Sequence, residues 1–210
     1  MKQSKEARFT AWLGVEAWRW LPRHDGGGTL DGMEELTPHP SQAPETIRSV
    51  KARIIGRDAQ WLRVRWNILG AGKLVVPPFA GRGRADGLWQ TTCFEMFVMP
   101  GEGPGYSEFN LSPSERWNAY DFTARREGMS ERPMPREPEC TMRKGTDMAI
   151  FDAAIPAAGL PEGDWLCGFT AVLEEEGGTR SYWAFAHGGD APDFHDPACF
   201  TLAVAAPKPA

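Results

Sequence analysis

Hydrophobic and polar residues alternate over several short stretches of this 210-residue chain, which is the pattern of half-buried β-strands. The clearest stretch runs from Gln60 to Leu69, where every second residue is a large apolar one. These apolar residues are Leu62, Val64, Trp66 and Ile68. Similar strand-forming stretches lie at 47–55, 73–76, 89–99, 106–111, 116–123, 140–143, 147–155, 165–174, 180–187 and 199–205. About ten short strands with no long helix between them predict an all-β fold, an antiparallel β-sandwich of jelly-roll type.

Glycine and proline separate these stretches and mark the turns. The 23 glycines and 18 prolines are scattered rather than periodic, as expected for many tight connections. Gly177 and Gly178 follow two glutamates between two of the predicted strands, and they predict a tight hairpin with positive φ angles.

Residues 1–32 differ from the rest of the chain. They carry a stripe of apolar residues at helical spacing, interrupted by Glu16, and then a glycine-rich stretch at 25–28. We therefore divide the chain into an N-terminal extension at 1–32, helical or disordered, a β-sandwich domain at 33–206 and a tail at 207–210. The extension is interpreted as a helix on a partner or membrane surface, as an appendage without a role, or as translated upstream sequence outside the native protein. We favour the last two, because one interrupted stripe is weak evidence for a docked helix.

Charge and hydropathy exclude several classes of partner. The net charge is −5 and the basic residues form no cluster, so we expect no nucleic-acid partner. No run approaches the roughly 20 apolar residues of a membrane span. The apolar run at 11–21 is broken by charges and lacks a cleavage site for secretion, so we expect a cytoplasmic protein.

The four cysteines lie far apart in the sequence, and each sits in an apolar stretch. They are Cys93, Cys140, Cys167 and Cys199. Their spacing excludes a zinc ribbon and a covalently attached c-type haem. We expect buried free thiols, and we expect no cofactor.

The first candidate functional residue is Glu95, which lies in a strand that is otherwise almost wholly apolar. Burying a carboxylate costs several kcal/mol unless it is paired. Glu95 therefore either accepts hydrogen bonds from a ligand or pairs with an arginine of a neighbouring strand, such as Arg63 or Arg65.

The second candidate group lies on the stretch Tyr106–Pro113. Glu108 and Asn110 share one face of this predicted strand, whereas Phe109 points to the other. A polar face beside aromatic rings suits a saccharide, because the apolar side of a sugar ring stacks on an aromatic ring and amides or carboxylates bind its hydroxyls. The alternative is an outer sheet face in contact with water.

The third candidate group combines His187, Asp193 and His195 in a short stretch that also contains proline. These residues could form a metal site. Either histidine could instead bind haem iron. The opposite haem ligand would then be Met96, Met99 or Met148. In the simplest interpretation, Asp193 caps loop backbone groups and each histidine fills a hydrogen-bonding niche.

Three stretches, taken in order, resemble the DOMON-like domains, which are related to family 9 carbohydrate-binding modules. The stretches are Leu88–Phe97, Tyr106–Trp117 and Tyr182–His195, with Ile155-Pro156 and Leu160-Pro161 between them. The resemblance covers 33–206 and implies a β-sandwich that binds either a saccharide or haem b. Saccharide-binding relatives hold the ligand between tryptophans, and haem-binding relatives use an axial methionine with histidine or lysine. Trp89 matches the tryptophan of the family motif, and Trp117 and Trp183 are the candidates for the second one.

The leading hypothesis is a non-catalytic module that binds a small saccharide. The expected ligand-binding residues are Trp89, Glu95, Glu108, Asn110, Trp117, Trp183, His187, Asp193 and His195. The first alternative is a haem b electron-transfer domain that uses His187 or His195 with a methionine. The second alternative is a metal-dependent enzyme that uses Glu95, His187 and His195.

Overall fold

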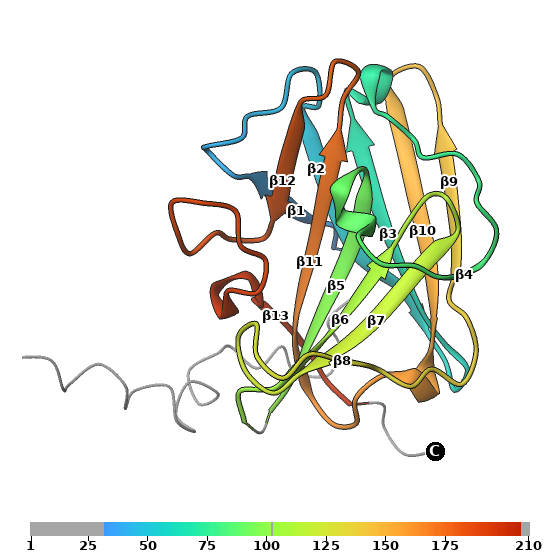
Figure 1. Cartoon of the computed structure of the whole chain (residues 1–210), viewed down its shortest axis with the longest axis vertical. Coiled ribbons are helices and arrows are strands. Elements are labelled where there is room, and N and C mark those ends of the chain that lie inside the picture. The colour runs from blue at the N-terminus through green and yellow to red at the C-terminus, as the bar shows by residue number, and fades with distance from the viewer. Residues whose placement is uncertain (1–31, 102, 207–210) are drawn as a thin grey trace, which may run out of the picture.

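The computed structural model describes residues 32–101 and 103–206, which fold into β-strands joined by turns (Figure 1). The strands are β1 (Glu34–Pro38), β2 (Ser49–Arg57), β3 (Trp61–Leu69), β4 (Gly83–Arg84), β5 (Cys93–Pro100), β6 (Tyr106–Leu111), β7 (Arg116–Phe122), β8 (Ser130–Glu131), β9 (Glu139–Lys144), β10 (Met148–Pro156), β11 (Trp165–Glu174), β12 (Arg180–Ala184) and β13 (Leu202–Val204). Short 3₁₀ helices lie at η2 (Ala71–Lys73), η3 (Leu88–Gln90), η4 (Ala157–Gly159) and η5 (Pro197–Cys199). In these two ranges there is no α-helix, and no helix is long and apolar enough to cross a bilayer. The all-β prediction is confirmed, whereas nearly all of the predicted N-terminal extension and the whole predicted tail lie outside the described residues.

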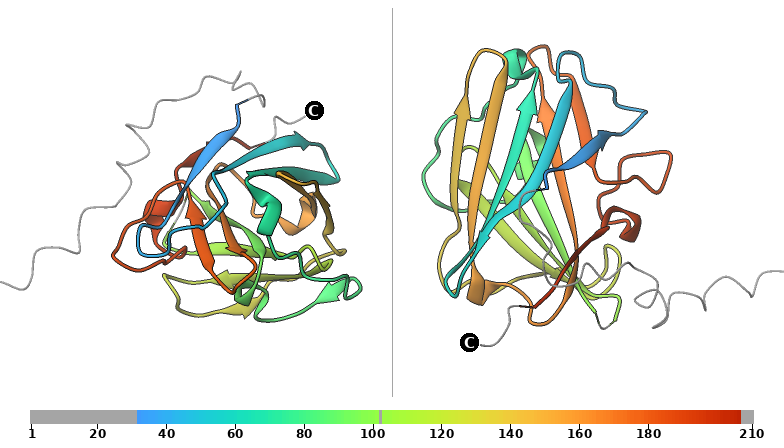
Figure 2. Two further views of the ribbon diagram at one scale, coloured as in Figure 1. Left: turned by 90° about the horizontal axis from the view of Figure 1, so that it is seen from above. Right: turned by 180° about the vertical axis from the view of Figure 1, so that it is seen from behind.

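The strands form one continuous sheet that curls into two facing layers. Its order is β4-β7-β6-β5-β11-β12-β1-β2-β3-β10-β9, with β13 beside β11 and β8 beside β7. We call β2, β3, β10 and β9 the back layer, and β4, β7, β6, β5, β11 and β12 the front layer; Figure 2 shows the two layers from above and from behind. Strand β1 joins them, because residues 34–36 pair with β2 whereas Thr37 and Pro38 pair with β12. The paired strands are antiparallel except β4 and β7, which are parallel.

The main core lies between the two layers and follows from the alternation of side chains along each strand. In β3, Leu62, Val64, Trp66 and Ile68 are fully buried, as their spacing predicts. The Trp66 ring packs 5.4 Å from that of Phe94 of the front layer, and Phe94 stacks on Phe151 at 4.2 Å. Aromatic contacts between the layers therefore hold the sheet in its curled form.

A second apolar cluster lies on the outer face of the front layer. There the segment 185–201 folds back over β5, β6 and β7, and its Phe194 and Phe200 pack with residues of the sheet. The Phe200 ring stacks on Phe97 at 5.4 Å, and Tyr106 stacks on Phe122 at 4.9 Å. This segment covers one part of the outer face. The neighbouring part stays uncovered and forms the floor of a cleft.

Some strand boundaries differ from the sequence prediction. Residues 73–76 form no strand, because the chain turns through the left-handed Gly70 into η2 and only Leu74 bridges to Glu175. The predicted strand at 89–99 begins instead at Cys93, since the left-handed Gly87 starts η3. Strand β1 was not predicted, because five residues with one buried side chain, that of Leu36, are too few to show an alternation.

Two local predictions are confirmed by the structure. All four cysteines are buried free thiols. Gly177 and Gly178 have φ angles of 105° and 90° and form the tight turn between β11 and β12. This hairpin places Tyr182 of β12 beside Val172 of β11 on the outer face of the front layer.

Candidate functional site

A cleft of about 720 Å³ lies on the outer face of the front layer, beside the covering segment 185–201. Its floor consists of side chains from five neighbouring strands, namely Glu95, Glu108, Asn110, Tyr120, Phe122, Val172 and Tyr182. One wall comes from residues 85–89, which lead into η3 and include the Trp89 indole. The opposite wall comes from 192–195, with Phe194 and His195. The cleft is therefore a groove between two loops above a sheet face.

The register of the front layer brings its polar side chains together. Glu95 of β5 lies opposite Asn110 of β6 on one side and opposite Thr170 of β11 on the other. Glu108 lies two residues from Asn110, so it shares the same face as a diagonal neighbour of Glu95. The two carboxyl side chains are almost fully buried, with 3% and 6% of the residue surface exposed.

Few protein groups satisfy these two carboxylates. Thr170 Oγ1 donates to Glu95 Oε2 at 3.2 Å, and Asn110 Nδ2 donates to Glu108 Oε1 at 2.7 Å. Glu108 Oε2 lies 3.8 Å from His195 Nε2. In the described part of the chain, no lysine or arginine lies within 4.0 Å of either carboxylate. Carboxylate oxygens of the pair are therefore free to form hydrogen bonds with a ligand in the cleft.

The protonation of the two carboxyl groups differs. Burial, together with the nearby charge of Glu108, raises the pKa of Glu95 to about 8. Burial also raises the pKa of Glu108, to about 6, against the opposing hydrogen bond from Asn110. The pair therefore keeps a proton at a higher pH than ordinary glutamates do. Such a pair both donates and accepts hydrogen bonds, which suits a ligand rich in hydroxyl groups.

A polar cluster fixes the loop that carries Trp89. Asn118 Nδ2 donates to Asp86 Oδ1 at 2.9 Å, and the Tyr120 hydroxyl donates to the same oxygen. Burial and this contact with Asp86 raise the pKa of Tyr120, which stays protonated as a donor. Arg84 donates to Asn118 Oδ1 at 2.5 Å from the other side. The Trp89 indole, 52% exposed, is therefore presented on an anchored loop.

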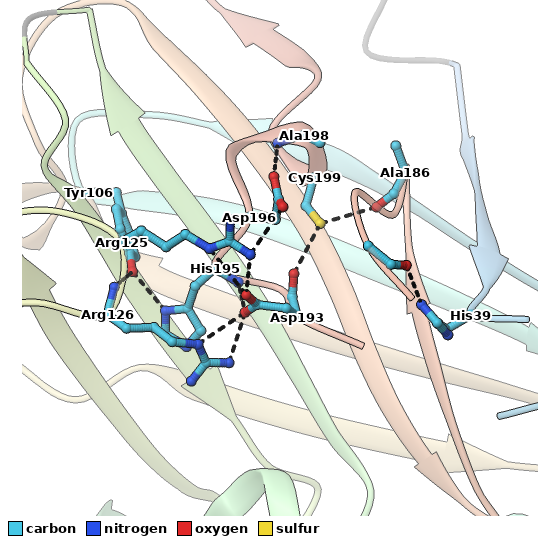
Figure 3. Close-up of polar contacts among 11 residues, drawn as sticks. His39, Tyr106, Arg125, Arg126, Ala186, Asp193, His195, Asp196, Ala198 and Cys199 are labelled. Atoms are coloured by element: carbon cyan, nitrogen blue, oxygen red, sulfur yellow. Dashed lines mark hydrogen bonds and ion pairs between the residues drawn. The ribbon is translucent and has the colours of Figure 1, made fainter. Parts of the chain in front are cut away.

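Figure 3 shows the polar contacts that hold the opposite wall. Arg125 and Arg126, from the turn after β7, both donate to the Asp193 carboxylate, at shortest distances of 2.6 and 2.8 Å. Tyr106 OH lies 2.7 Å from His195 Nδ1. Burial and the charge of Arg126 lower the pKa of His195 to about 4, so its ring is neutral at pH 7. His195 thus faces Glu108 as an uncharged hydrogen-bonding group.

The structure brings together five of the predicted site residues. Trp89, Glu95, Glu108, Asn110 and His195 all line the cleft. Asp193 supports it from behind, through the arginine contacts. Sequence reasoning did not select the other lining residues, among them the polar Asp86, Tyr120 and Arg126. Tyr120 could have been predicted, because it lies two residues from Asn118 on β7 and so shares its face. Asp86 and Arg126 lie in loops, where no alternation predicts which way a side chain points.

Trp117 and Trp183 do not reach the cleft. They are 3% and 2% exposed and point into the core between the layers. Alternation is the reason, because the neighbouring Asn118 and Tyr182 occupy the outer face at these points of β7 and β12. The Trp183 Nε1 group donates to Ser181 Oγ at 2.9 Å, and the Arg84 guanidinium lies over the Trp117 ring at 4.4 Å. The expectation that either tryptophan stacks on a ligand beside Trp89 is corrected.

Glu95 does not pair with an arginine, which was the structural alternative considered for it. Arg63 instead contacts Asp58 at 2.5 Å. Arg65 contacts Asp152 at 2.6 Å, within the back layer. The carboxyl group of Glu95 therefore faces the cleft without an ionic partner among the described residues.

The residues of the haem and metal hypotheses are not brought together. His187 lies outside the cleft, with its Nε2 2.9 Å from the Thr37 carbonyl and its ring against His39. Met96 points into the inner core, on the opposite face of β5 from Glu95, and Met99 packs at the edge of the outer cluster. Within 32–101 and 103–206, no three His, Cys, Asp or Glu side chains are grouped to hold a metal ion.

Comparison with solved structures shows that other proteins have a fold similar to that of this chain. No protein-family model and no curated protein sequence matches the chain. A candidate carbohydrate-binding protein of Bacteroides uniformis aligns with 81% of this chain and 84% of its own, with a TM-score of 0.57 and 16% identity. A family 9 carbohydrate-binding module of Caldicellulosiruptor kristjanssonii in complex with cellotriose covers 81% of this chain and 80% of its own, with a TM-score of 0.49 and 11% identity. The glucose complex of a family 9 module from that organism covers 71% and 72%, with a TM-score of 0.44 and 11% identity.

Proposed function

We propose that the chain binds a small saccharide in the cleft of the front layer, without transforming it. The observation that carries the proposal is the placement of the exposed Trp89 indole beside a floor of buried carboxyl and amide groups. An indole stacks on the apolar face of a sugar ring, while Glu95, Glu108 and Asn110 take its hydroxyls. The fold shared with the candidate carbohydrate-binding protein supports this proposal, as does the resemblance of Leu88–Phe97 to the DOMON-like motif.

The size of the cleft is consistent with this ligand class. A volume of about 720 Å³ lies within the usual range of small-molecule sites and has room for one or two sugar rings. Stacking and hydrogen bonds on an open sheet face give weak binding, with an expected Kd of about 10 μM to 1 mM. The proposal places Trp89 as the single stacking tryptophan, with Tyr120 and Tyr182 on the floor below it.

Replacement of Trp89 tests the proposal. Titration of the wild type with glucose, cellobiose and other small saccharides up to about 50 mM should change the tryptophan fluorescence with saturation. Trp89→Ala should abolish this change and lower the free energy of unfolding by less than about 1 kcal/mol, since the side chain is half exposed.

Trp61→Ala is the matched control, because this indole lies on β3 of the back layer under the Arg136 guanidinium, 4.0 Å away. It should leave saccharide binding unchanged. A wild type that responds to no saccharide, or a Trp89→Ala variant that binds as the wild type does, would contradict the proposal.

A further inference from the structure

The cleft carries more negative than positive charge. Three carboxyl residues line it, Asp86, Glu95 and Glu108. Arg126 is the lining arginine, and its Nε and Nη2 atoms both donate to Asp193 Oδ1, at 3.1 and 2.8 Å. Arg126 thus pairs with a carboxylate outside the cleft, although its charge also acts on Glu95 and Glu108 and favours their charged forms. The lining histidine, His195, is uncharged at neutral pH for the reasons given above.

The two buried carboxyl groups also keep unused hydrogen-bonding positions. Glu95 receives one hydrogen bond from the described residues, at Oε2 from Thr170, and its Oε1 receives none. Glu108 Oε2 has only the 3.8 Å contact with the neutral His195. A nearly buried carboxylate with no cation in direct contact is unfavourable by several kcal/mol, so a positively charged ligand group would stabilise the charged form of the pair.

Aromatic rings line the same cleft as these oxygens. Trp89, Tyr120, Tyr182, Phe122 and Phe194 line the cleft together with the three acids. The face of an aromatic ring attracts a cation within about 6 Å of its centre, and an indole does so most strongly. Carboxylates and aromatic faces in one groove therefore favour a ligand that has an apolar ring surface and a positive charge.

We infer that the preferred ligand is an aminated saccharide, a hexosamine unit whose ring stacks on Trp89 and whose ammonium group lies at Glu95 and Glu108. This inference rests on the proposed function, because it names the class of saccharide for the same cleft. An ammonium group donates three hydrogen bonds and can use the free oxygens of both carboxyl groups. A neutral sugar of the same size brings no positive charge to the two carboxyl groups.

The test compares three sugars that differ at one substituent. Glucosamine, N-acetylglucosamine and glucose are titrated at pH 7 against the full chain, with tryptophan fluorescence and calorimetry as readouts. Glucosamine should bind at least about tenfold more tightly than glucose, and this advantage should shrink as salt is added, since the ammonium contact is partly exposed to solvent. N-acetylglucosamine, which keeps the nitrogen but loses the charge and gains an acetyl group, should bind no better than glucose.

Variants assign the preference to the carboxyl pair. Glu108→Gln and Glu95→Gln should each lower the ratio of the glucosamine affinity to the glucose affinity to less than about threefold, because each removes one carboxylate from the ammonium site and glutamine keeps the size of the side chain. Glu162→Gln removes one charge from the exposed loop before β11 and serves as the control, with no change for either sugar. A melting curve of each variant checks that it is folded.

The outcomes separate this inference from the proposed function. If glucose binds in a Trp89-dependent manner and glucosamine binds no more tightly, the inference is overturned and saccharide binding stands. If glucosamine keeps its advantage in both glutamine variants, the carboxyl pair is not the recognition element and the inference is again overturned. If no sugar binds up to about 50 mM, both proposals are wrong.

Discussion

Glu95 and Glu108 show how one sheet face couples folding to proton binding. Each side chain is nearly buried, and each pKa lies above the ordinary value of a glutamate. The folded state therefore holds protons that the unfolded chain releases. The free energy of unfolding decreases as the pH rises over the range in which the folded state binds more protons than the unfolded one. For Glu95 this range runs from about 4.5, the ordinary pKa, to about 8.

Glu95→Gln should remove most of this pH dependence. The glutamine side chain has the same shape and carries no charge, so it avoids the penalty that the buried carboxylate meets at high pH. We expect the variant to be more stable than the wild type at pH 8 by roughly 1–3 kcal/mol, with little difference at pH 4.5. Urea unfolding at a series of pH values measures this. Equal slopes of stability against pH in the two proteins would show that Glu95 keeps an ordinary pKa.

The same residues mark how far the sequence could predict the site. Glu95 stood out because a charged residue interrupts an apolar strand, and Glu108 and Asn110 stood out because residues two apart share a face. Both signals are local. Trp117 and Trp183 were predicted at the binding face but lie in the core, because alternation shows only that a residue lies on one of two faces. Which face points inward depends on the neighbouring layer, and no local pattern contains that information.

At the scale of elements, the segment 185–201 forms a wall of the cleft and is held by apolar contacts of Phe194 and Phe200 and by ion pairs of Asp193. Its Asp193 carboxylate receives hydrogen bonds from Arg125 and Arg126, which are half exposed. Exposed ion pairs contribute little to global stability, commonly less than about 1 kcal/mol. Their effect here is therefore local: they hold Phe194 and His195 against the sheet.

Asp193→Asn should loosen this wall without unfolding the protein. We expect faster amide hydrogen exchange over 185–201, a loss of at most about 1 kcal/mol in the free energy of unfolding, and several-fold weaker saccharide binding. Asp147→Asn, which breaks the exposed contact between Arg48 and Asp147 elsewhere, is the matched control and should change neither exchange in this segment nor binding. Unchanged exchange in Asp193→Asn would mean that the apolar contacts of Phe194 and Phe200 alone fix the segment.

The hairpin between β11 and β12 anchors a second loop through Glu175. This carboxylate is buried and accepts hydrogen bonds from the backbone N–H groups of Glu45 and Thr46, both at 2.7 Å, and from the Thr46 hydroxyl. Burial by itself raises the pKa of Glu175, but these donors outweigh it, and the pKa is lowered. Its contribution to stability is therefore present above the ordinary pKa of a glutamate and is lost as the pH falls through the lowered value.

Glu175→Ala should leave the backbone N–H groups of Glu45 and Thr46 without their acceptor, whereas the Thr46 hydroxyl keeps the Gly70 carbonyl. We expect a loss of roughly 2–3 kcal/mol at pH 7, which thermal or urea unfolding measures. The difference from the wild type should shrink as the pH falls through the lowered pKa of Glu175, because the carboxylate then becomes protonated. A loss that stays constant at all pH values would indicate a packing effect instead.

For the whole molecule, the class of fold followed from short-range patterns, whereas the curl of the sheet did not. Alternation in β3 and the glycine pair after β11 identified elements correctly, because each is encoded within a few residues. The order of strands depends on contacts between distant segments, such as the pairing of β3 with β10. Strand β1 escaped prediction for the same reason: its register with β2 and β12 joins the two layers, yet its own sequence buries only Leu36.

The division of the chain at Met33 leads to a prediction at this scale. We propose that residues 1–32 are not needed for the fold, since β1 begins at Glu34 and the core begins at Leu36. A chain that starts at Met33 should melt within about 2 °C of the full chain and bind saccharide equally well. A chain that starts at His39 lacks the joining strand and should lose at least about 2 kcal/mol. Failure of the Met33 chain to fold would show that the extension is part of the domain.

The most direct test of the account is NMR spectroscopy of the tryptophan indole N–H groups while glucosamine or glucose is added. Trp89 is exposed at the cleft, whereas Trp66, Trp117, Trp165 and Trp183 are buried in the core. We predict that one indole signal, assigned through its absence from Trp89→Ala, shifts with saturation while the signals of the four core tryptophans stay in place. A saccharide that leaves the Trp89 signal unmoved, or that shifts only other indole signals, would contradict the location of the site and the function proposed for it.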